Sequence, residues 1–517
     1  MPDLSFLSLS PPLLLLMASL FLRRPGCRPG HLPALAEAVM LASLGLALAA
    51  LAQLMLGGPR LVGLGQALSL RLDAISVTMG LLVSFVGWIV VRFSRRYMDG
   101  EAREGAFHGL TLAAIASVLV LVQAGSLPVL VLGFAATGLV LRQLLLFYPD
   151  RPEAQRAAAK FTRVWVAGDL AVAMAAALLW AGFGTADIGM VLAAAQADAL
   201  PLAAHAAVVL LVLAAVLKTA AFPLHGWLTE VMEAPTPVSA LLHAGIINSG
   251  GVLLITLAGL VQQSAGAMAA LALIGGLTAL FGALVMLTQS AVKTAFAWST
   301  VAQMGFMLLQ CGLGLWALAL LHIVAHSLYK AHAFLSAGGA VQVVNAIRKP
   351  GPVAVPGFGA VARSFGLALV LYAAVATGFS LVMGPKSAQA IALGAMLIFG
   401  VSYLIAQGLA DAAPGALTRR TVQASLGAAL AYFGFQVVAQ AVWGQALPAA
   451  PVPGPLEWAL IVLAVLSFGL VAVAQALFPL WAHHPSTAGL RVHLANGLYL
   501  NAVFDRLSGG FRLTSKS

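Results

Sequence analysis

The stretch LAAHAAVVLLVLAAVLKTAAFP (202–223) decides the fold class, because it is a long apolar run that ends in a lysine and a proline. A helix needs about 20 apolar residues to cross a bilayer. Pro223 ends such a helix, because proline lacks a backbone N–H and clashes with the preceding turn. The stretch therefore predicts a membrane helix that breaks near Lys218–Pro223 and leaves carbonyl groups available to water or to an ion.

The composition of the whole chain points the same way. Of 517 residues, 61% are hydrophobic and 8% are charged, and the mean hydropathy is +1.00. Soluble proteins carry about 25% charged residues, so a globular cytosolic enzyme, a coiled coil and a disordered chain are all excluded. Continuous apolar runs favour helices over an outer-membrane barrel. We therefore expect an all-α polytopic membrane protein.

About 15 transmembrane helices (13–16) are expected from the apolar runs. Asp3 precedes the first run and Arg23, Arg24 and Arg28 follow it, which is typical of an uncleaved anchor with its N-terminus outside. The runs lie at 4–22, 32–56, 68–91, 106–124, 127–148, 162–183, 202–222, 237–261, 267–288, 294–312, 315–345, 364–384, 388–410, 421–443 and 457–480.

The positive charges test this topology. With alternating loops, 21 of the 27 Lys and Arg residues fall on the inner side and 3 on the outer side, as the positive-inside rule requires. The outer three are Arg60, Arg71 and Lys386. The net charge of +11 is thereby explained without nucleic acid, and the expected location is a bacterial cytoplasmic (inner) membrane, with the C-terminus cytoplasmic.

Ionisable residues inside apolar runs are functional candidates, because burying a charge in hydrocarbon is costly. Lys218 and Asp169 are two of them. A buried lysine can exchange a proton, whereas snorkelling to an interface is the alternative without a function. Asp169 either pairs with a cation on a neighbouring helix or remains a neutral, hydrogen-bonded acid. After Pro223, a short amphipathic piece places Glu230 and Glu233 on one face.

Histidine is the side chain best suited to proton exchange near neutral pH. His322, His326 and Lys330 have the spacing i, i+4, i+8 and so share one helical face, with steps of about 6 Å. We expect a proton relay along this stripe, joined by His243, and Lys293 at a helix start is a further ionisable candidate. Metal binding by the two stripe histidines is a weaker alternative, since no third ligand is evident.

The sequence contains no Walker motif, no GxGxxG after a strand, no CxxCH and no HExxH. Its two cysteines, Cys27 and Cys311, are far apart. We therefore expect no catalytic residue, cofactor or metal on this chain, and any covalent chemistry to belong to a partner. The expected function is to move or gate ions.

Five blocks resemble the proton-translocating antiporter-like family, which includes the large membrane subunits of respiratory complex I and of Mrp-type antiporters. They are LRLDAISVTM (70–79), VRFSRRYM (91–98), KTAAFPLHGWLTEVMEAPTPVSALLHAG (218–245), KTAFAWSTVAQMGFM (293–307) and HIVAHSLYKAHAFLSAG (322–338).

The resemblance implies a fold with inverted five-helix repeats. It also implies that Lys218 is the channel lysine, that His243 connects, and that the relay continues through Lys293, His322, His326 and Lys330. The implied organisation is N-terminal transmembrane helices (1–105), an antiporter-like translocation core (106–350), divergent C-terminal transmembrane helices (351–480) and a cytoplasmic tail (481–517). We expect the tail to be a solvated end at the headgroups, with a docking segment as the alternative.

The chain departs from the family pattern in three places. Where the family carries a glutamate that pairs with the channel lysine, LGFAATGL (132–139) has Ala135. Asp169, Glu230 or Glu233 must replace that partner if any residue does. Residues 350–480 also lack the usual family blocks, and there is no long lateral helix.

The sequence LLHAGIINSGG (241–251) resembles that of the membrane subunits of DAB-type inorganic-carbon accumulation systems. This resemblance implies a large peripheral DabA-like partner on the cytoplasmic face, a zinc protein similar to a β-carbonic anhydrase. It implies that cation flow, with H+ as the expected ion, drives CO2 hydration and traps bicarbonate. The alternatives are a proton-pumping subunit of a complex I or hydrogenase-type redox complex, and an Mrp-type cation/proton antiporter subunit.

Overall fold

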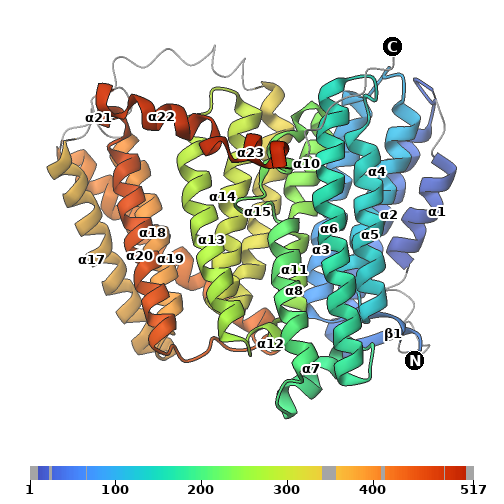
Figure 1. Ribbon diagram of the computed structural model, residues 1–517, viewed down its shortest axis with the longest axis horizontal. Helices are drawn as coiled ribbons and strands as arrows, with labels where there is room; N and C mark the ends of the chain where they lie inside the picture. Colours follow the sequence, from blue (N-terminus) through green and yellow to red (C-terminus); the bar gives the residue numbers. More distant parts are fainter. Residues whose placement is uncertain are drawn as a thin grey trace.

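The computed structural model describes residues 10–22, 26–65, 67–339, 357–408, 414–481 and 484–507. Within these ranges the chain is a row of roughly parallel helices that runs from α1 at one end to α17 at the other (Figure 1). Eleven of the described helices are long and apolar enough to cross a membrane, judged by length and composition. The predicted all-α polytopic membrane architecture is confirmed.

The N-terminal part consists of three helices, with a small hairpin between the second and the third. The hairpin pairs β1 with β2 in antiparallel fashion, with Val62 opposite Leu70. Asp73 caps the next helix, because its side chain accepts a hydrogen bond from Ser76 N at 2.7 Å. The elements are α1 (Ser10–Leu22), α2 (Leu32–Gly57), β1 (Arg60–Leu64), β2 (Leu68–Leu72) and α3 (Ala74–Tyr97).

The next helices form a tight group in which α4 packs on α5, α5 on α6, and α6 on α8. Gly133 permits the first of these approaches, since a Cβ there would lie 2.9 Å from Leu121 Cα. The helices are α4 (Glu104–Val122), α5 (Leu127–Leu145), α6 (Pro152–Phe183), α7 (Ile188–Ala197) and α8 (Leu202–Lys218).

The chain then becomes irregular, as the proline predicts. Helix α8 ends at Lys218, and the Phe222–Pro223 peptide bond is cis. A second interruption falls at Gly245–Asn248, inside the run expected as one helix. The pieces are α9 (Gly226–Thr229), η2 (Val231–Glu233), α10 (Thr236–Ala244), η3 (Ile246–Asn248), α11 (Ser249–Thr256) and α12 (Ala258–Val261).

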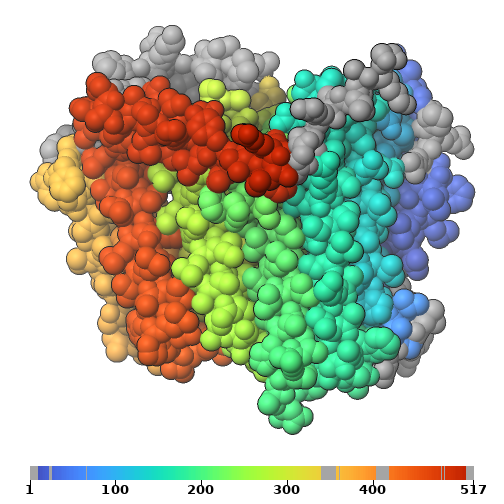
Figure 2. Space-filling model, in the orientation of Figure 1, coloured from blue at the N-terminus to red at the C-terminus, as the bar shows by residue number. Residues whose placement is uncertain are grey.

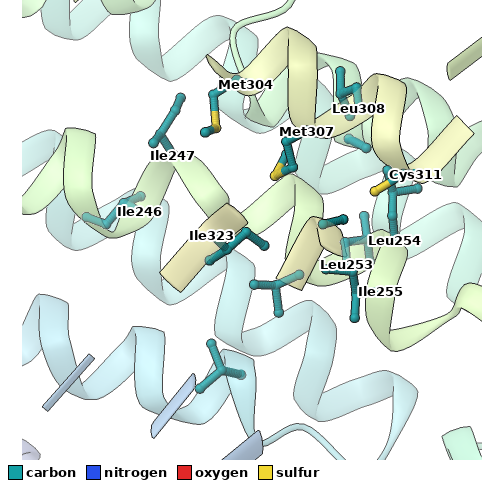
Figure 3. Close-up of a cluster of buried hydrophobic side chains, with 14 of the residues drawn as sticks. Ile246, Ile247, Leu253, Leu254, Ile255, Met304, Met307, Leu308, Cys311 and Ile323 are labelled. Carbon is teal, nitrogen blue, oxygen red and sulfur yellow. The ribbon is translucent and has the colours of Figure 1, made fainter. Parts of the chain in front are cut away.

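These broken segments lie in the middle of the molecule, where α11 contacts α8, α14 and α15. Their apolar side chains fill the space between those helices, as the residues around Met307 and Ile323 show in Figure 3. The long helices that follow the broken segments in the chain are α13 (Ala265–Met286), α14 (Val292–Gly312) and α15 (Trp316–Ser336). Helix α15 continues into η4 (Ala337–Gly339).

The C-terminal helices form a bundle that packs against α13 and α15, and the chain then returns across one end of the molecule. The bundle consists of α17 (Phe358–Met383), α18 (Ala388–Gly408), α19 (Pro414–Trp443) and α20 (Pro455–Ala476). The returning segment holds α21 (Phe478–Trp481), η5 (Pro485–Thr487), α22 (Ala488–Ala495), η6 (Gly497–Tyr499) and α23 (Leu500–Leu507). Figures 1 and 2 show it lying across the helix ends, which we call the tail face.

Each expected apolar run overlaps a helix, and apart from the interrupted run 237–261 the differences lie at the ends of the runs. The run 68–91 begins in β2 and its helix continues to Tyr97. The run 162–183 belongs to a helix that starts at Pro152, because its polar first turns are helical too. Residues 340–345 of the run 315–345, and the arginines at 23 and 24, lie outside the described residues.

Candidate functional site

The first part of the site is an ion pair between the middle of α6 and the last residue of α8. Lys218 is fully buried, and its Nζ forms a salt bridge with a carboxylate oxygen of Asp169. The ammonium also donates to Trp165 O at 3.2 Å and lies 3.9 Å from the Trp165 ring centroid. The Phe134 ring is 4.8 Å away on the other side. A carboxylate, a carbonyl and two aromatic faces therefore surround the lysine.

This arrangement answers which carboxylate accompanies Lys218. Asp169 does, and its side chain retains 18% exposure, whereas that of Lys218 has none. Glu230 and Glu233 bind other cations. Gly168 makes the approach of the two helices possible, because a Cβ there would meet Lys218 Cε at 3.1 Å. Ala135, at the position where the antiporter-like family carries a glutamate, directly follows Phe134 on α5.

The helix break beside Lys218 is held by side-chain hydrogen bonds. Thr219 Oγ1 donates to Ala215 O at 2.7 Å, and Phe222 N donates to Thr278 Oγ1 at 3.0 Å. The Trp227 indole N–H donates to Leu217 O at 3.1 Å, so one freed carbonyl is satisfied by the protein. The break is thus a fixed part of the structure rather than a frayed helix end.

His243 links the broken segment to the second half of the site. It is fully buried on α10, its Nδ1 lies 3.1 Å from Thr300 Oγ1, and its ring stacks on Phe334 at a centroid distance of 4.4 Å. Among the described residues its Nε2 has no hydrogen-bond partner. Its electrostatic neighbour is Lys330. His243 therefore lies near Lys330, and its connection to Lys218 stays a prediction.

The predicted stripe on α15 lies inside the protein. His322 Nδ1 is 2.8 Å from Gln310 Oε1, and the rings of His322 and His326 are 6.1 Å apart. Neither ring nitrogen of His326 has a hydrogen-bond partner within the described part of the chain. Lys330 is fully buried and donates to Phe296 O at 3.1 Å. His322, His243 and Lys330 all lie close enough to His326 to interact electrostatically.

Lys293 stands apart from these groups. It is the second residue of α14 and is half-buried at the tail face. The structure therefore brings Lys218 together with Asp169. It also brings His243 together with the α15 stripe of His322, His326 and Lys330. Lys293, at the start of α14, joins neither group.

A second polar cluster lies at the tail face, where sequence reasoning placed only separate charges. The Lys160 side chain is fully buried, and its Nζ contacts Glu230 Oε1 at 2.8 Å and Asp505 Oδ1 at 2.6 Å. Arg156 contacts the other oxygen of Asp505 at 2.7 Å. Asn501 bonds to both Lys160 and Glu230. The tail is thus anchored on α6 and beside α9 through Asn501 and Asp505, whereas most side chains of residues 484–507 are exposed, as expected for a solvated end.

Glu233 belongs to neither cluster. It contacts Arg151 at 3.2 Å on the surface, where both side chains are substantially exposed. Exposed pairs of this kind contribute little. The structure therefore separates the two glutamates that sequence reasoning had grouped.

Sequence reasoning missed three groups of the site. Trp165 stands four residues before Asp169, so the i, i+4 spacing was an available signal. Asn501 and Asp505 have the same spacing on α23, but nothing local indicates the partner, which lies more than 300 residues earlier. His108 on α4 is also fully buried, with no hydrogen-bond partner for either ring nitrogen among the described residues.

Within the described ranges, no group of three or more His, Cys, Asp or Glu side chains is placed to hold a metal ion. The i, i+4 histidines of α15 contact each other and Gln310 instead.

Comparison with known proteins now places this architecture in a class. The model described as "NADH:quinone oxidoreductase/Mrp antiporter, TM" matches residues 124–349, and that of the complex I chain 5 N-terminus matches residues 62–108. A solved Mrp complex from Dietzia sp. DQ12-45-1b superposes with a TM-score of 0.59 at 23% identity, covering 98% of this chain and 56% of that one. The protein has the fold of an antiporter-like membrane subunit.

Two curated relatives narrow the class. The probable inorganic carbon transporter subunit DabB2 of Halothiobacillus neapolitanus is 37% identical, and the alignment covers 98% of this chain and 94% of that relative. The probable subunit DabB of Hydrogenovibrio crunogenus is 43% identical over 52% of each chain. The chain belongs to the DabB family of inorganic carbon transporter subunits.

Proposed function

We propose that this protein is the membrane subunit of an energy-coupled complex that accumulates inorganic carbon. In this proposal it conducts a cation, H+ in the first instance, and the flow drives CO2 hydration by a peripheral partner. The observation that carries the proposal is the near full-length similarity to DabB2, together with buried titratable groups in the middle of the helices. Charged groups inside membrane helices usually mark ion pathways.

The residues divide into two parts of one route. Lys218 and Asp169 form the first, at the helix break, and His243 with the α15 stripe forms the second. Within the second part, His326 is the natural proton acceptor, because both of its ring nitrogens lack protein partners within the described residues. A water molecule in such a polar space can carry a proton from one group to the next.

The chemistry of hydration is assigned to the partner. We propose a large zinc-bearing, β-carbonic-anhydrase-like subunit on the cytoplasmic side of an inner membrane. The relatives are themselves named as subunits, which supports a multisubunit assembly. A gentle pull-down of tagged chain from native membranes, with partner masses and metal content measured together, tests this. One large soluble zinc protein is expected, whereas several iron-bearing membrane partners would indicate a redox pump instead.

Growth provides the functional test. A host without carbonic anhydrase should grow in air only when this chain and its partner are both expressed. Rescue that survives complete uncoupling of the membrane would contradict energy coupling. Sodium or potassium exchange in vesicles without carbon accumulation would instead favour an Mrp-type antiporter.

A further inference from the structure

A groove between α3 and α15 is separate from the relay and combines two kinds of surface. It encloses about 1030 Å³ and is lined by arginines at one level and by apolar side chains at another. Both helices end on the tail-face side, with α3 ending at Tyr97 and α15 at Ser336. The groove therefore runs from the end of a membrane-spanning helix toward its middle.

The basic part of the groove lies in the last turns of α3. Arg92, Arg95 and Arg96 all line it, and Glu37 on α2 pairs with the first two. In the part of the chain that the structure describes, no ion pair is formed by Arg96, which is exposed. The three arginines exceed the one glutamate by two charges, so the end of the groove is complementary to an anion.

The apolar part lies one to three turns deeper. Phe85 and Ile89 on α3 and Leu328 on α15 line the groove at this deeper level. Phe85 is 39% exposed and Leu328 is 43% exposed, so the groove opens sideways to the surroundings. From Phe85 to Arg96 the helix rises about 16 Å, which is comparable to the distance between acyl chain and phosphate in a lipid leaflet.

We propose that this groove binds an anionic glycerophospholipid, with the phosphate among the arginines and one acyl chain along Phe85, Ile89 and Leu328. Basic pockets between transmembrane helices are typical sites for anionic headgroups. A free phosphate or bicarbonate would use the arginines but not the apolar floor, and a zwitterionic lipid would not use the excess positive charge. The proposal is independent of the transported ion and of the partner.

Native mass spectrometry of the full chain, purified in mild detergent, tests the site. The probes are phosphatidylglycerol, phosphatidylcholine and inorganic phosphate, each titrated separately. We expect one phosphatidylglycerol to be retained in preference to phosphatidylcholine. Arg96→Glu should lower that retention about fivefold or more, because it reverses the charge of the groove arginine that forms no ion pair with any described residue. Arg420→Glu, at an exposed arginine on α19 outside the groove, should leave it unchanged.

A second variant separates lipid from free anion. Leu328→Asn keeps the charge but makes the floor polar, and it should lower phosphatidylglycerol retention about threefold without affecting phosphate. Equal retention of the two lipids, or retention unaffected by Arg96→Glu, would overturn the proposal. So would binding of phosphate that matches the lipid, or a co-purified polypeptide whose loss alone follows Arg96→Glu. A monodisperse elution profile shows that each variant is folded.

Discussion

The two buried lysines, Lys218 and Lys330, occupy opposite halves of the site and have different surroundings. Lys218 is paired with the carboxylate of Asp169 and lies against the Trp165 ring. Lys330 donates to Phe296 O, and the ring centroids of Phe296 and Tyr329 lie 5.7 and 5.8 Å from its Nζ. Within the described residues no carboxylate pairs with it. Both side chains are fully buried.

The difference indicates two ways to keep a titratable amine inside a membrane protein. Beside Lys218, a charged pair is neutral as a unit, which limits the cost of burial. Beside Lys330, the neighbours are histidines, so a proton that leaves the lysine has His326 one turn away as an acceptor. In the proposed function, Lys218 keeps its proton because Asp169 supplies the counter-charge, whereas Lys330 transfers its proton to His326.

The largest expected effect is the loss of Lys218. Lys218→Ala should reduce coupled carbon accumulation to background, because it removes the only cation paired with Asp169 among the described residues. Membrane insertion should remain intact, as detected by the amount of chain in washed membranes. Lys386→Ala, outside both halves of the site, serves as the control and should retain activity. Normal accumulation in Lys218→Ala would show that the first half is not on the route.

His326→Ala should have an effect nearly as large. The change interrupts the stripe between His322 and Lys330 and removes the group whose nitrogens both lack protein partners among the described residues. We expect at least a tenfold loss of uptake, measured as labelled bicarbonate inside cells. His205→Ala, on the exposed start of α8, is the matched histidine control.

Asp169→Asn tests whether the counter-charge itself matters. It leaves Lys218 buried without a carboxylate, and breaking a buried pair costs about 3 kcal/mol or more. Uptake should fall about tenfold and the unfolding temperature in detergent should drop. Asp169→Glu should recover part of both. The double variant Asp169→Asn, Ala135→Glu moves the carboxylate to the position implied by the antiporter-like family. Partial recovery in the double variant would show that Lys218 needs a nearby carboxylate whichever helix supplies it. Full activity of Asp169→Asn alone would show that Lys218 needs no counter-charge.

The smallest expected effect concerns the docked tail. Asp505→Asn removes one of two carboxylates that contact Lys160 and leaves Glu230 in place. We therefore expect a fall of one to two degrees in unfolding temperature and less than a twofold change in uptake. Arg506→Gln, exposed on the same helix, should change neither. A complete loss of uptake in Asp505→Asn would place the tail in the route itself.

Much of the fold could be predicted from local pattern. The apolar runs indicate the helices, the Lys218–Pro223 spacing indicates the break, and i, i+4, i+8 places the three groups of α15 on one face. These features depend on residues close together in the chain. The interruption at Gly245–Asn248 is not evident from the sequence, because glycine and asparagine inside an apolar run are weaker helix breakers than an internal proline.

The pairings between distant segments could not be predicted in the same way. Asp169 and Lys218 are 49 residues apart, and three carboxylates were equally available from the sequence. Arg156 and Asp505 are 349 residues apart. Helix packing decides which groups meet, and packing depends on small residues such as Gly168 that a hydropathy pattern does not distinguish from any other apolar position.

The central claim is that cation flow past Lys218 drives carbon accumulation. The most direct measurement follows labelled bicarbonate inside cells that express this chain and its partner, with and without a protonophore, for the natural chain and for Lys218→Ala. The account predicts accumulation that collapses on uncoupling, and that is absent in Lys218→Ala although the partner is still bound to the membrane. Accumulation that persists in either case would contradict it.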